Sequence, residues 1–192
     1  MEKMLEDRVA IITGSGRGIG KAAALMFAGE GAKVVVSDLD PEPAEETASE
    51  IRAAGGDAVV VAGDVTDPAF AETIVKKAVD TWGALHILVN NAGFTWDGTA
   101  HKMTDQQWEA IIAVHLTAPF RLIRAAAPYM RDVAKQEKLD GKVVNRKIIN
   151  VSSIAGTRGS AGQTNYSSAK AGIVGMARTL SKEWGAFNVQ AN

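Results

Sequence analysis

The sequence predicts an α/β protein in which a doubly wound parallel sheet carries helices on both faces, and three observations point to this class. Short apolar runs alternate with longer amphipathic segments at a spacing of roughly 25–35 residues, as βαβ units do. The runs are continuously apolar, which indicates strands buried on both faces. The first run leads directly into a glycine-rich turn and a helical pattern, and right-handed crossovers complete such a sandwich.

Four apolar runs in the first half predict strands, and three segments between them predict helices. Pro41 and the pair Gly55-Gly56 bound the second helix, while Thr66, Asp67 and Pro68 provide an N-cap and first turn for the third. The expected strands are Arg8–Thr13, Lys33–Ser37, Ala58–Ala62 and His86–Asn90, and the expected helices are Ile19–Gly29, Pro41–Ala54 and Thr66–Trp82.

The second half continues the alternation. Thr104 and Gln107 match a capping box for a helix that continues towards Val133. We expect loops at Ala92–Lys102, Lys135–Asn145 and Ile154–Thr164, strands at Lys147–Val151 and Asn188–Asn192, and a last helix at Asn165–Trp184.

The composition narrows the class of protein. A chain of 192 residues predicts one domain, 1–192. A net charge of -1 argues against nucleic-acid binding. The lack of Cys excludes disulfides and Cys-based metal sites, and we expect no metal. The charged start Met1–Arg8 has no signal-peptide core, and we see no apolar run near the ~20 residues of a membrane helix. We therefore expect a cytoplasmic protein without a membrane partner.

The segment Thr13–Gly20 lies between a strand and a helix, where a phosphate-binding turn belongs. Glycines let the backbone approach a pyrophosphate, and the free N–H groups of the helix start attract the anion. The pattern is T-G-x-x-x-G-x-G rather than G-x-G-x-x-G, and a tight turn without a ligand is the alternative interpretation. The expected cofactor contacts are Gly14, Ser15, Arg17, Gly18, Ile19 and Gly20.

Acidic residues follow the next two strands. Asp38 lies 18 residues after Gly20, and an acid about 20 residues beyond the turn binds a ribose 2′-OH and repels a 2′-phosphate. Asp38 therefore favours NAD, whereas Arg17 could accept the 2′-phosphate of NADP. As an N-cap for the next helix, Asp40 fits better than Asp38. Asp64, with Val65, could reach an adenine edge, or Asp64 could only cap the following turn.

Tyr166 and Lys170 are four residues apart at the start of a predicted helix, so they share one face. A phenol that acts as an acid or base near neutral pH needs a nearby cation. The alternative is an ordinary surface pair. Ser153 favours catalysis, because it follows the fifth strand, where active-site residues of open α/β sheets gather.

Four segments together resemble the short-chain dehydrogenase/reductases: Thr13–Gly20, Asn90–Gly93, Ser153 and Tyr166–Lys170. The resemblance covers nearly the whole chain and implies a Rossmann-type sheet, a nicotinamide cofactor and hydride exchange with a carbonyl or secondary alcohol. It implies that Tyr166 protonates the carbonyl oxygen, that Lys170 binds the nicotinamide ribose and tunes Tyr166, and that Ser153 positions the substrate. Asn90 would hold the fourth strand, and the implied cofactor contacts include Asn91, Ala92, Gly93, Tyr166 and Lys170.

The stretch Gly162–Gly172 looks most like the 3-oxoacyl-acyl-carrier-protein reductase branch, which implies an acyl-thioester substrate and a homotetramer or homodimer. His115 stands where the family usually has an Asn that supports a proton path to the lysine, and we hypothesise that the imidazole replaces it. A half-buried His on an amphipathic helix is the alternative. Phe187 replaces a basic residue typical of carrier-protein reductases, and Phe94 and Trp96 could line a substrate cleft or cover the core.

Two other functions compete with a reductase: a non-catalytic, redox-sensing dinucleotide-binding module, and sugar-nucleotide chemistry on a related fold. Relatives continue beyond the sixth strand into a substrate lid and one more strand. We therefore expect 1–192 to be C-terminally incomplete. The residues present indicate the type of reaction, but they do not identify the substrate.

Overall fold

The computed structural model describes residues 3–192, so Met1 and Glu2, the first residues of the charged start, lie outside the described range. A six-stranded sheet forms its centre, in the order β3-β2-β1-β4-β5-β6, and all neighbouring strands are parallel. The doubly wound, Rossmann-type fold is thus confirmed. The strands are β1 Val9–Thr13, β2 Lys33–Ser37, β3 Asp57–Val60, β4 Ile87–Asn90, β5 Arg146–Asn150 and β6 Val189–Ala191.

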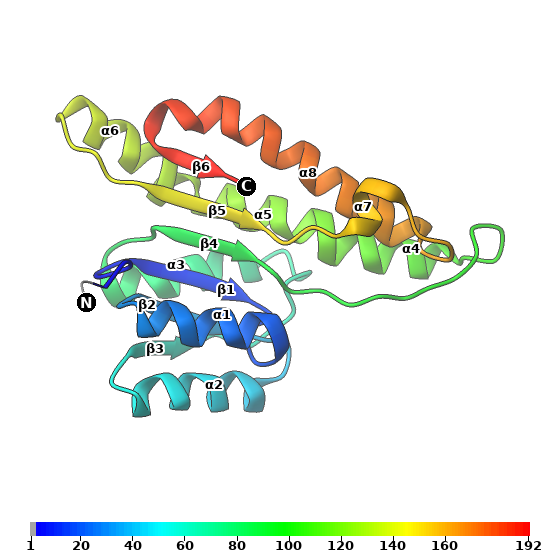
Figure 1. Ribbon diagram of the computed structural model, residues 1–192, viewed down its shortest axis with the longest axis horizontal. Coiled ribbons are helices and arrows are strands. Elements are labelled where there is room, and N and C mark those ends of the chain that lie inside the picture. Colours follow the sequence, from blue (N-terminus) through cyan, green and yellow to red (C-terminus); the bar gives the residue numbers. More distant parts are fainter. Residues whose placement is uncertain (1–2) are drawn as a thin grey trace.

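Helices cover both faces of the sheet (Figure 1). In β1, Ala10 and Ile12 belong to the core under α1 and α2, whereas Ile11 belongs to the core under α3, α5 (Ala118–Ala127) and α8. Successive residues of a strand point to opposite faces, which explains why this run is apolar at every position. The bounds of four of these helices are α1 Gly18–Gly29, α2 Pro41–Ala53, α3 Phe70–Trp82 and α8 Thr164–Trp184.

The order of the strands reverses between β1 and β4. From β1 the chain builds outwards through β2 and β3, and then returns to place β4, β5 and β6 on the other side. At such a reversal the loops that leave the two central strands diverge and open a crevice at the carboxyl edge of the sheet. The glycine-rich turn after β1 meets the segment after β4 there, because a Cβ on Gly14 would lie 2.8 Å from the Cα of Ala92.

A continuous helical stretch from Asp105 to Leu139 packs beside α3 and α8. The capping box of Thr104 and Gln107 is confirmed at its start. By length and composition alone this stretch could cross a membrane, which differs from the sequence expectation; 44% of its apolar window is buried in the fold. Its parts are α4 Asp105–Ile112, a π-helical turn Ala113–Thr117, α5 Ala118–Ala127, a second π-helical turn Pro128–Asp132 and α6 Val133–Leu139.

The loop predicted at Lys135–Asn145 is wrong in its first part, because α6 continues to Leu139. Two contacts anchor this last helical segment. Ala134 is buried in the core, and Glu137 pairs with both terminal nitrogens of the buried Arg146 at 2.6 and 3.1 Å. These tertiary contacts override the polar composition of the segment.

Two further helix starts differ from the prediction by more than one residue, and β3 ends at Val60 rather than at Ala62. The loop expected at Ile154–Thr164 begins with a short helix, α7 (Ile154–Arg158). The third helix starts at Phe70 rather than near Thr66, because the carboxylates of Asp64 and Asp67 accept the N–H groups of Thr66 and Ala69 and form turns ahead of it.

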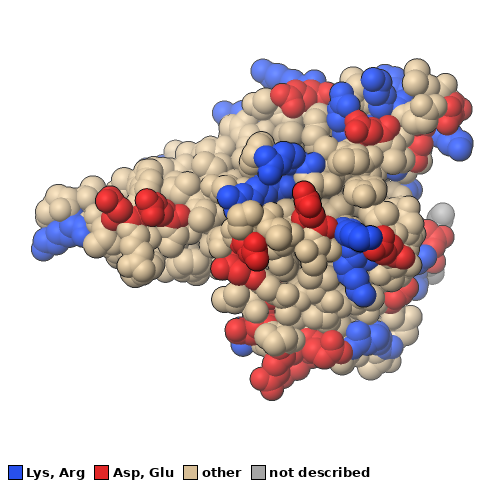
Figure 2. Space-filling view, turned by 180° about the vertical axis from the view of Figure 1, so that it is seen from behind, with Lys and Arg blue, Asp and Glu red and all other residues tan. Residues whose placement is uncertain are grey.

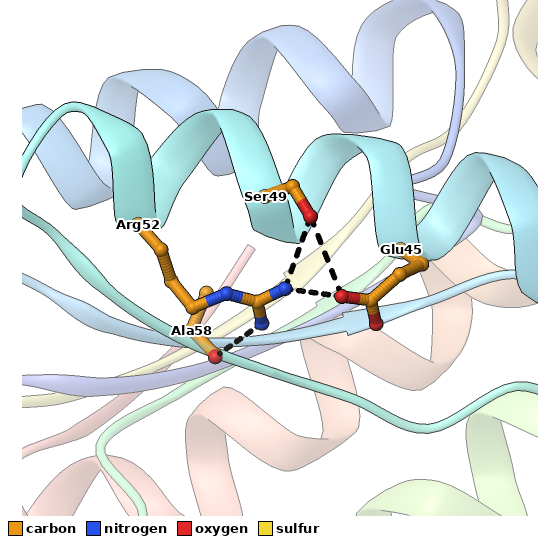
Figure 3. Close-up of polar contacts among 4 residues, drawn as sticks. All are labelled: Glu45, Ser49, Arg52 and Ala58. Carbon is orange, nitrogen blue, oxygen red and sulfur yellow. Dashed lines mark hydrogen bonds and ion pairs between the residues drawn. The ribbon is translucent and has the colours of Figure 1, made fainter.

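The outer strand β3 is tied to α2 by one arginine (Figure 3). Arg52 donates to the carbonyl of Ala58 at 3.1 Å and to the hydroxyl of Ser49 at 3.1 Å, and it pairs with Glu45. Side chains that cover an edge strand protect it from pairing with other chains.

Seen from behind in Figure 2, Lys and Arg are interspersed with Asp and Glu over the body, whereas the projecting end that holds α7 and the start of α4 is mostly uncharged.

Candidate active site

Two cavities of about 480 and 460 Å³ adjoin at the crevice and share Gly14, Asp38, Ala92, Gly93 and Phe94. The first brings together the glycine-rich turn with His115, Tyr166 and Lys170; the second contains Asp64 and Val65. The structure therefore gathers most of the predicted site residues in one groove. A further cavity of about 360 Å³ beside α3 and α5 has none of them among its lining residues.

The glycine-rich turn needs its glycines. Gly14 and Gly18 have φ of 63° and 55°, which disfavours a side chain. A Cβ on Gly20 would lie 2.0 Å from the carbonyl oxygen of Gly14. α1 begins at Gly18, so the N–H groups of its first turn have no helical partner. This narrow turn with free donors suits the pyrophosphate of a dinucleotide.

Ser15 lies behind the turn rather than on its open side. Its hydroxyl donates to the carbonyl of Ile12 at 2.7 Å and accepts the N–H of Ser37 at 2.9 Å, and its own N–H donates to the Ser37 carbonyl at 2.8 Å. The side chain is fully buried. Ser15 thus connects the turn to β2 by hydrogen bonds, and the predicted contact of Ser15 with the cofactor stays a prediction.

Asp38 and Asp64, the acidic residues predicted to contact the cofactor, both line the crevice. Asp38 accepts the N–H of Gly16 at 2.9 Å and faces both cavities. Arg17 forms an exposed ion pair with Asp40 at 2.9 Å. Asp64 accepts both the N–H and the hydroxyl of Thr66 at 2.8 Å, so its capping role is present, and it also lines the second cavity.

The segment after β4 braces the turn. Asn91 donates its amide to the carbonyls of Thr13 and Gly14 at 2.9 and 3.0 Å. The hydroxyl of Thr13 accepts the N–H groups of Asn91 and Ala92 at 3.1 Å each, so Thr13 belongs to this brace, a role that its place in the turn segment Thr13–Gly20 does not predict. Asn90 instead donates to the side chain of Asn150 at 2.8 Å, which links β4 to β5. Only the strand register brings those two residues together.

Lys170 is a buried cation beside Tyr166. Lys170 is only 4% exposed, and its ammonium donates to the carbonyl of Val151. The ammonium nitrogen lies 5.6 Å from the centre of the Tyr166 ring. Burial lowers the pKa of Lys170 from 10.5 to about 8, so the amine is mostly protonated at neutral pH. This burial is at odds with the alternative of an ordinary surface pair.

His115 lies in the first π-helical turn, with its ring edge-on to Tyr166 at a centroid distance of 5.0 Å. Burial lowers the pKa of His115 to about 4, so the ring is neutral at pH 7. Its Nε2 lies 2.7 Å from the carbonyl oxygen of Phe94 and 3.3 Å from the N–H of the same residue. We assign the proton to Nε2 from the shorter contact, because a carbonyl oxygen can only accept; the buried Nδ1 is then an acceptor without a partner among residues 3–192. A Cβ on Gly93 would lie 2.0 Å from the ring.

Ser153 takes a different position from the other predicted catalytic residues. Its hydroxyl accepts the N–H of Ala155 at 3.2 Å and caps α7, and it is not among the residues that line the cavity. Ser152 does line it and donates to the carbonyl of Lys170 at 2.9 Å. Among residues 3–192, no group of three or more His, Asp or Glu side chains could hold a metal ion.

Known proteins match the chain along nearly its full length. The family model described as short chain dehydrogenase matches residues 8–192. A hydroxyacyl-CoA dehydrogenase of Mycobacterium tuberculosis is 43% identical over 98% of this chain and 60% of its own. A 3-oxoacyl-[acyl-carrier-protein] reductase of Thermotoga maritima is 38% identical over 98% of this chain and 72% of its own.

A solved structure agrees with these matches. The crystal structure of a short chain dehydrogenase from Mycobacterium avium has a TM-score of 0.90 and 41% identity, and covers 98% of this chain and 66% of its own. The chain spans between 20% and 72% of the length of six curated relatives that it matches.

Proposed function

The chain belongs to the short-chain dehydrogenase family, and from this premise we propose that it is an oxidoreductase acting on a carbonyl or a secondary alcohol. The observation that carries the proposal is the pair of Tyr166 and the buried Lys170 on the first turns of α8, facing the groove that the glycine-rich turn borders. When bound, a nicotinamide cofactor would supply or accept the hydride. The groove fits its pyrophosphate at the turn after β1 and its adenosine end near Asp38, Asp64 and Val65.

The chain's own residues would handle the proton. In the reducing direction the Tyr166 hydroxyl donates its proton to the carbonyl oxygen as negative charge develops there. The ammonium of Lys170, held by the carbonyl of Val151, favours the phenolate that remains. In the oxidising direction the same phenolate accepts the proton of the alcohol.

His115 is proposed to stand in the path that returns a proton to Lys170. The support is the unpartnered Nδ1 of a neutral ring packed against Tyr166. An Asn side chain offers a comparable acceptor, so His115→Asn should keep more turnover than His115→Ala. Full turnover in both variants would exclude the path.

NAD is proposed as the preferred cofactor. Asp38 faces the groove, and Asp40 already neutralises Arg17, the cation that would have to receive a 2′-phosphate. Either carboxylate would repel that phosphate. NADP stays the alternative because the Arg17–Asp40 pair is exposed and opens at little cost.

A 3-oxoacyl or 3-hydroxyacyl thioester is the proposed substrate class. Two relatives carry names for such chemistry, one on an acyl carrier protein and one on CoA. Phe94 and Trp96 are 47% and 40% exposed on the loop beside the groove, where apolar substrate atoms could cover them.

Assembly as a homodimer or homotetramer belongs to the same proposal. Large apolar residues along the helical stretch that follows this loop remain exposed, among them Phe120 at 48%, Trp108 at 40% and Val133 at 40%. Light scattering coupled to gel filtration would report the number of subunits.

The experiment that tests the proposed activity follows NADH and NADPH absorbance with a panel of 3-oxoacyl thioesters, ketones and secondary alcohols. We expect turnover of at least one thioester with NADH, and none above background for Tyr166→Phe. Tight NADH binding without turnover of any compound would favour the non-catalytic module, which the capping position of Ser153 also favours.

A further inference from the structure

Asn165 is a fully buried polar residue directly before Tyr166 that the proposed mechanism leaves unused. Its amide nitrogen donates to the carbonyls of Trp96 and Gln107 at 3.1 and 3.0 Å, and its side-chain oxygen accepts the N–H of Tyr166 at 2.7 Å. One side chain therefore joins the loop after β4, the first turns of α4 and the start of α8.

Neighbouring contacts fasten the same loop. The N–H of Gly98 donates to the carbonyl of Gly162 at 2.8 Å, and Gly98 forms a parallel bridge with Gln163. The amide of Gln163 donates to the carboxylate of Asp97 at 3.1 and 3.2 Å. The contacts between Gln163 and Asp97 are exposed, whereas the side chain of Asn165 is fully buried, so Asn165 is the part of the clamp that water replaces least easily.

The loop held in this way forms one wall of the groove. Phe94 and Thr95 line the cavity that also contains Tyr166, and the carbonyl of Phe94 meets the ring of His115. A shift of this loop relative to α8 would change both the width of the groove and the surroundings of Tyr166.

We propose that Asn165 is a positioning residue that locks the 94–98 loop to the start of α8, so that the wall of the groove and Tyr166 keep one fixed relation. The part that concerns turnover rests on the proposed function, while the part that concerns the loop does not. Asn165 touches no reacting atom and acts through its neighbours.

The first test measures hydrogen exchange of the Gly98 amide by NMR in the full chain without cofactor. Asn165→Ala removes all three contacts, and Asn165→Asp keeps the acceptor for the Tyr166 N–H but loses both donors. We expect both variants to speed this exchange about tenfold, the usual size of an effect when buried partners are lost. Thr164→Ala, a change at the exposed neighbour on the same turn, should leave it unchanged.

The second test measures kcat, KM and their pH dependence with NADH and acetoacetyl-CoA as the probe. We expect Asn165→Ala to lower kcat about tenfold and to move the half-maximal pH, because Tyr166 would no longer sit in its fixed place beside Lys170. A loss of folded protein alone would scale the rate without moving the pH profile.

The outcomes separate the inference from the proposed function. Unchanged Gly98 exchange in the Asn165 variants would contradict the proposed role of Asn165, whatever their activity. A wild-type protein without turnover would contradict only the proposed function. If the Asn165 variants do not fold, the wild-type protein decides: side-chain amide hydrogens of Asn165 that exchange at least about tenfold more slowly than those of the more exposed Gln163 support the clamp, and equal rates contradict it.

Discussion

At the scale of single residues, the candidate site contains polar side chains that are buried from solvent and have few hydrogen-bond partners. Lys170 is buried, its ammonium meets the carbonyl of Val151, and burial lowers its pKa to about 8. His115 is buried against Tyr166, and one of its ring nitrogens has no partner in the part of the chain that the structure describes. Such perturbed groups in a groove are a physical signature of functional sites.

Gly93 and His115 give the first prediction. A Cβ at Gly93 would lie 2.0 Å from the imidazole, and Gly93 has no positive φ, so the cost of Gly93→Ala comes from this contact. We expect Gly93→Ala to lower the free energy of unfolding by about 1–3 kcal/mol. Denaturant unfolding should show that the cost nearly disappears in a His115→Ala background. Equal costs in both backgrounds would refute the contact.

Asp38 gives the second prediction. Wild-type protein should bind NADH more tightly than NADPH, and Asp38→Asn should reduce that preference about tenfold, because Asn keeps an acceptor for the Gly16 N–H but removes the charge. Fluorescence titration with each cofactor measures both affinities. Asp40→Asn is the matched change, since it frees Arg17 and should improve NADPH binding. Tighter binding of NADPH by the wild type would contradict the proposed role of Asp38.

The sequence predicted most of the residues that lie at the candidate site, but it did not predict the contacts that each of them makes there. Spacing alone placed Tyr166 and Lys170 on one helix face, and strand ends placed Gly14 and Asp38 at one edge. It could not show that Ser15 turns inward, because that depends on contacts with β2. The same holds for the pairing of Asn90 with Asn150, which depends on strand register.

At the scale of elements, α7 and α8 approach closely. A Cβ on Gly156 in α7 would lie 2.6 Å from the carbonyl carbon of Lys170 in α8. This contact sets how near the Ser153-capped helix comes to the helix that carries Tyr166 and Lys170. Glycine is therefore required at this crossing for space rather than for backbone conformation.

Gly156→Ala is the third prediction. We expect it to lower the unfolding free energy by about 1–3 kcal/mol, because the helices must separate to fit the methyl group. Gly175→Ala is the control within α8: its added Cβ meets open space, so the change should stabilise the protein by about 0.5–1 kcal/mol. Thermal unfolding of the two variants compares them. A Gly156→Ala variant as stable as Gly175→Ala would rule out the close crossing.

Element boundaries followed local patterns only where tertiary contacts did not intervene. β2 was predicted with its observed bounds, and the capping box at Thr104 was found. The extent of α6 and the start of α3 were not predicted. The ion pair of Glu137 with the buried Arg146 extends α6, and two aspartate-capped turns delay the start of α3. α7 was missed because its start depends on the hydroxyl of Ser153, and a Gly/Ser-rich segment otherwise reads as a loop.

At the scale of the whole molecule, the candidate site and a buried titratable contact lie at opposite edges of the parallel sheet. The groove lies at the carboxyl edge. Near the other edge, His86 accepts the N–H of Val9 at 3.0 Å, close to Arg146, Arg8 and Glu137. Burial, with the charges of Arg146 and Arg8, lowers the pKa of His86 from 6.5 to about 4.

The fourth prediction is a loss of stability in mild acid. The folded-state pKa values of His86 and His115 lie near 4, below the unfolded value of 6.5, so the unfolded chain binds more protons between these values. Stability is therefore full above the unfolded pKa and falls as the pH drops towards the folded one. From about pH 7 to about pH 5 each histidine should cost about 2 kcal/mol.

His86→Gln should roughly halve this pH dependence, which urea unfolding at the two pH values measures, because His115 still titrates. An unchanged pH dependence in His86→Gln would show that His86 is protonated in the folded protein as easily as in the unfolded chain.

We propose that Tyr166 and Lys170 serve hydride transfer in this groove. The decisive measurement incubates the protein with acetoacetyl-CoA and NADH that carries deuterium at both hydrogens of the reactive nicotinamide carbon. Mass spectrometry should find 3-hydroxybutyryl-CoA with one deuterium on the carbon that was the ketone, and none of it with Tyr166→Phe. Labelled product formed equally by Tyr166→Phe, or NADH binding with no labelled product from the wild type, would contradict the account.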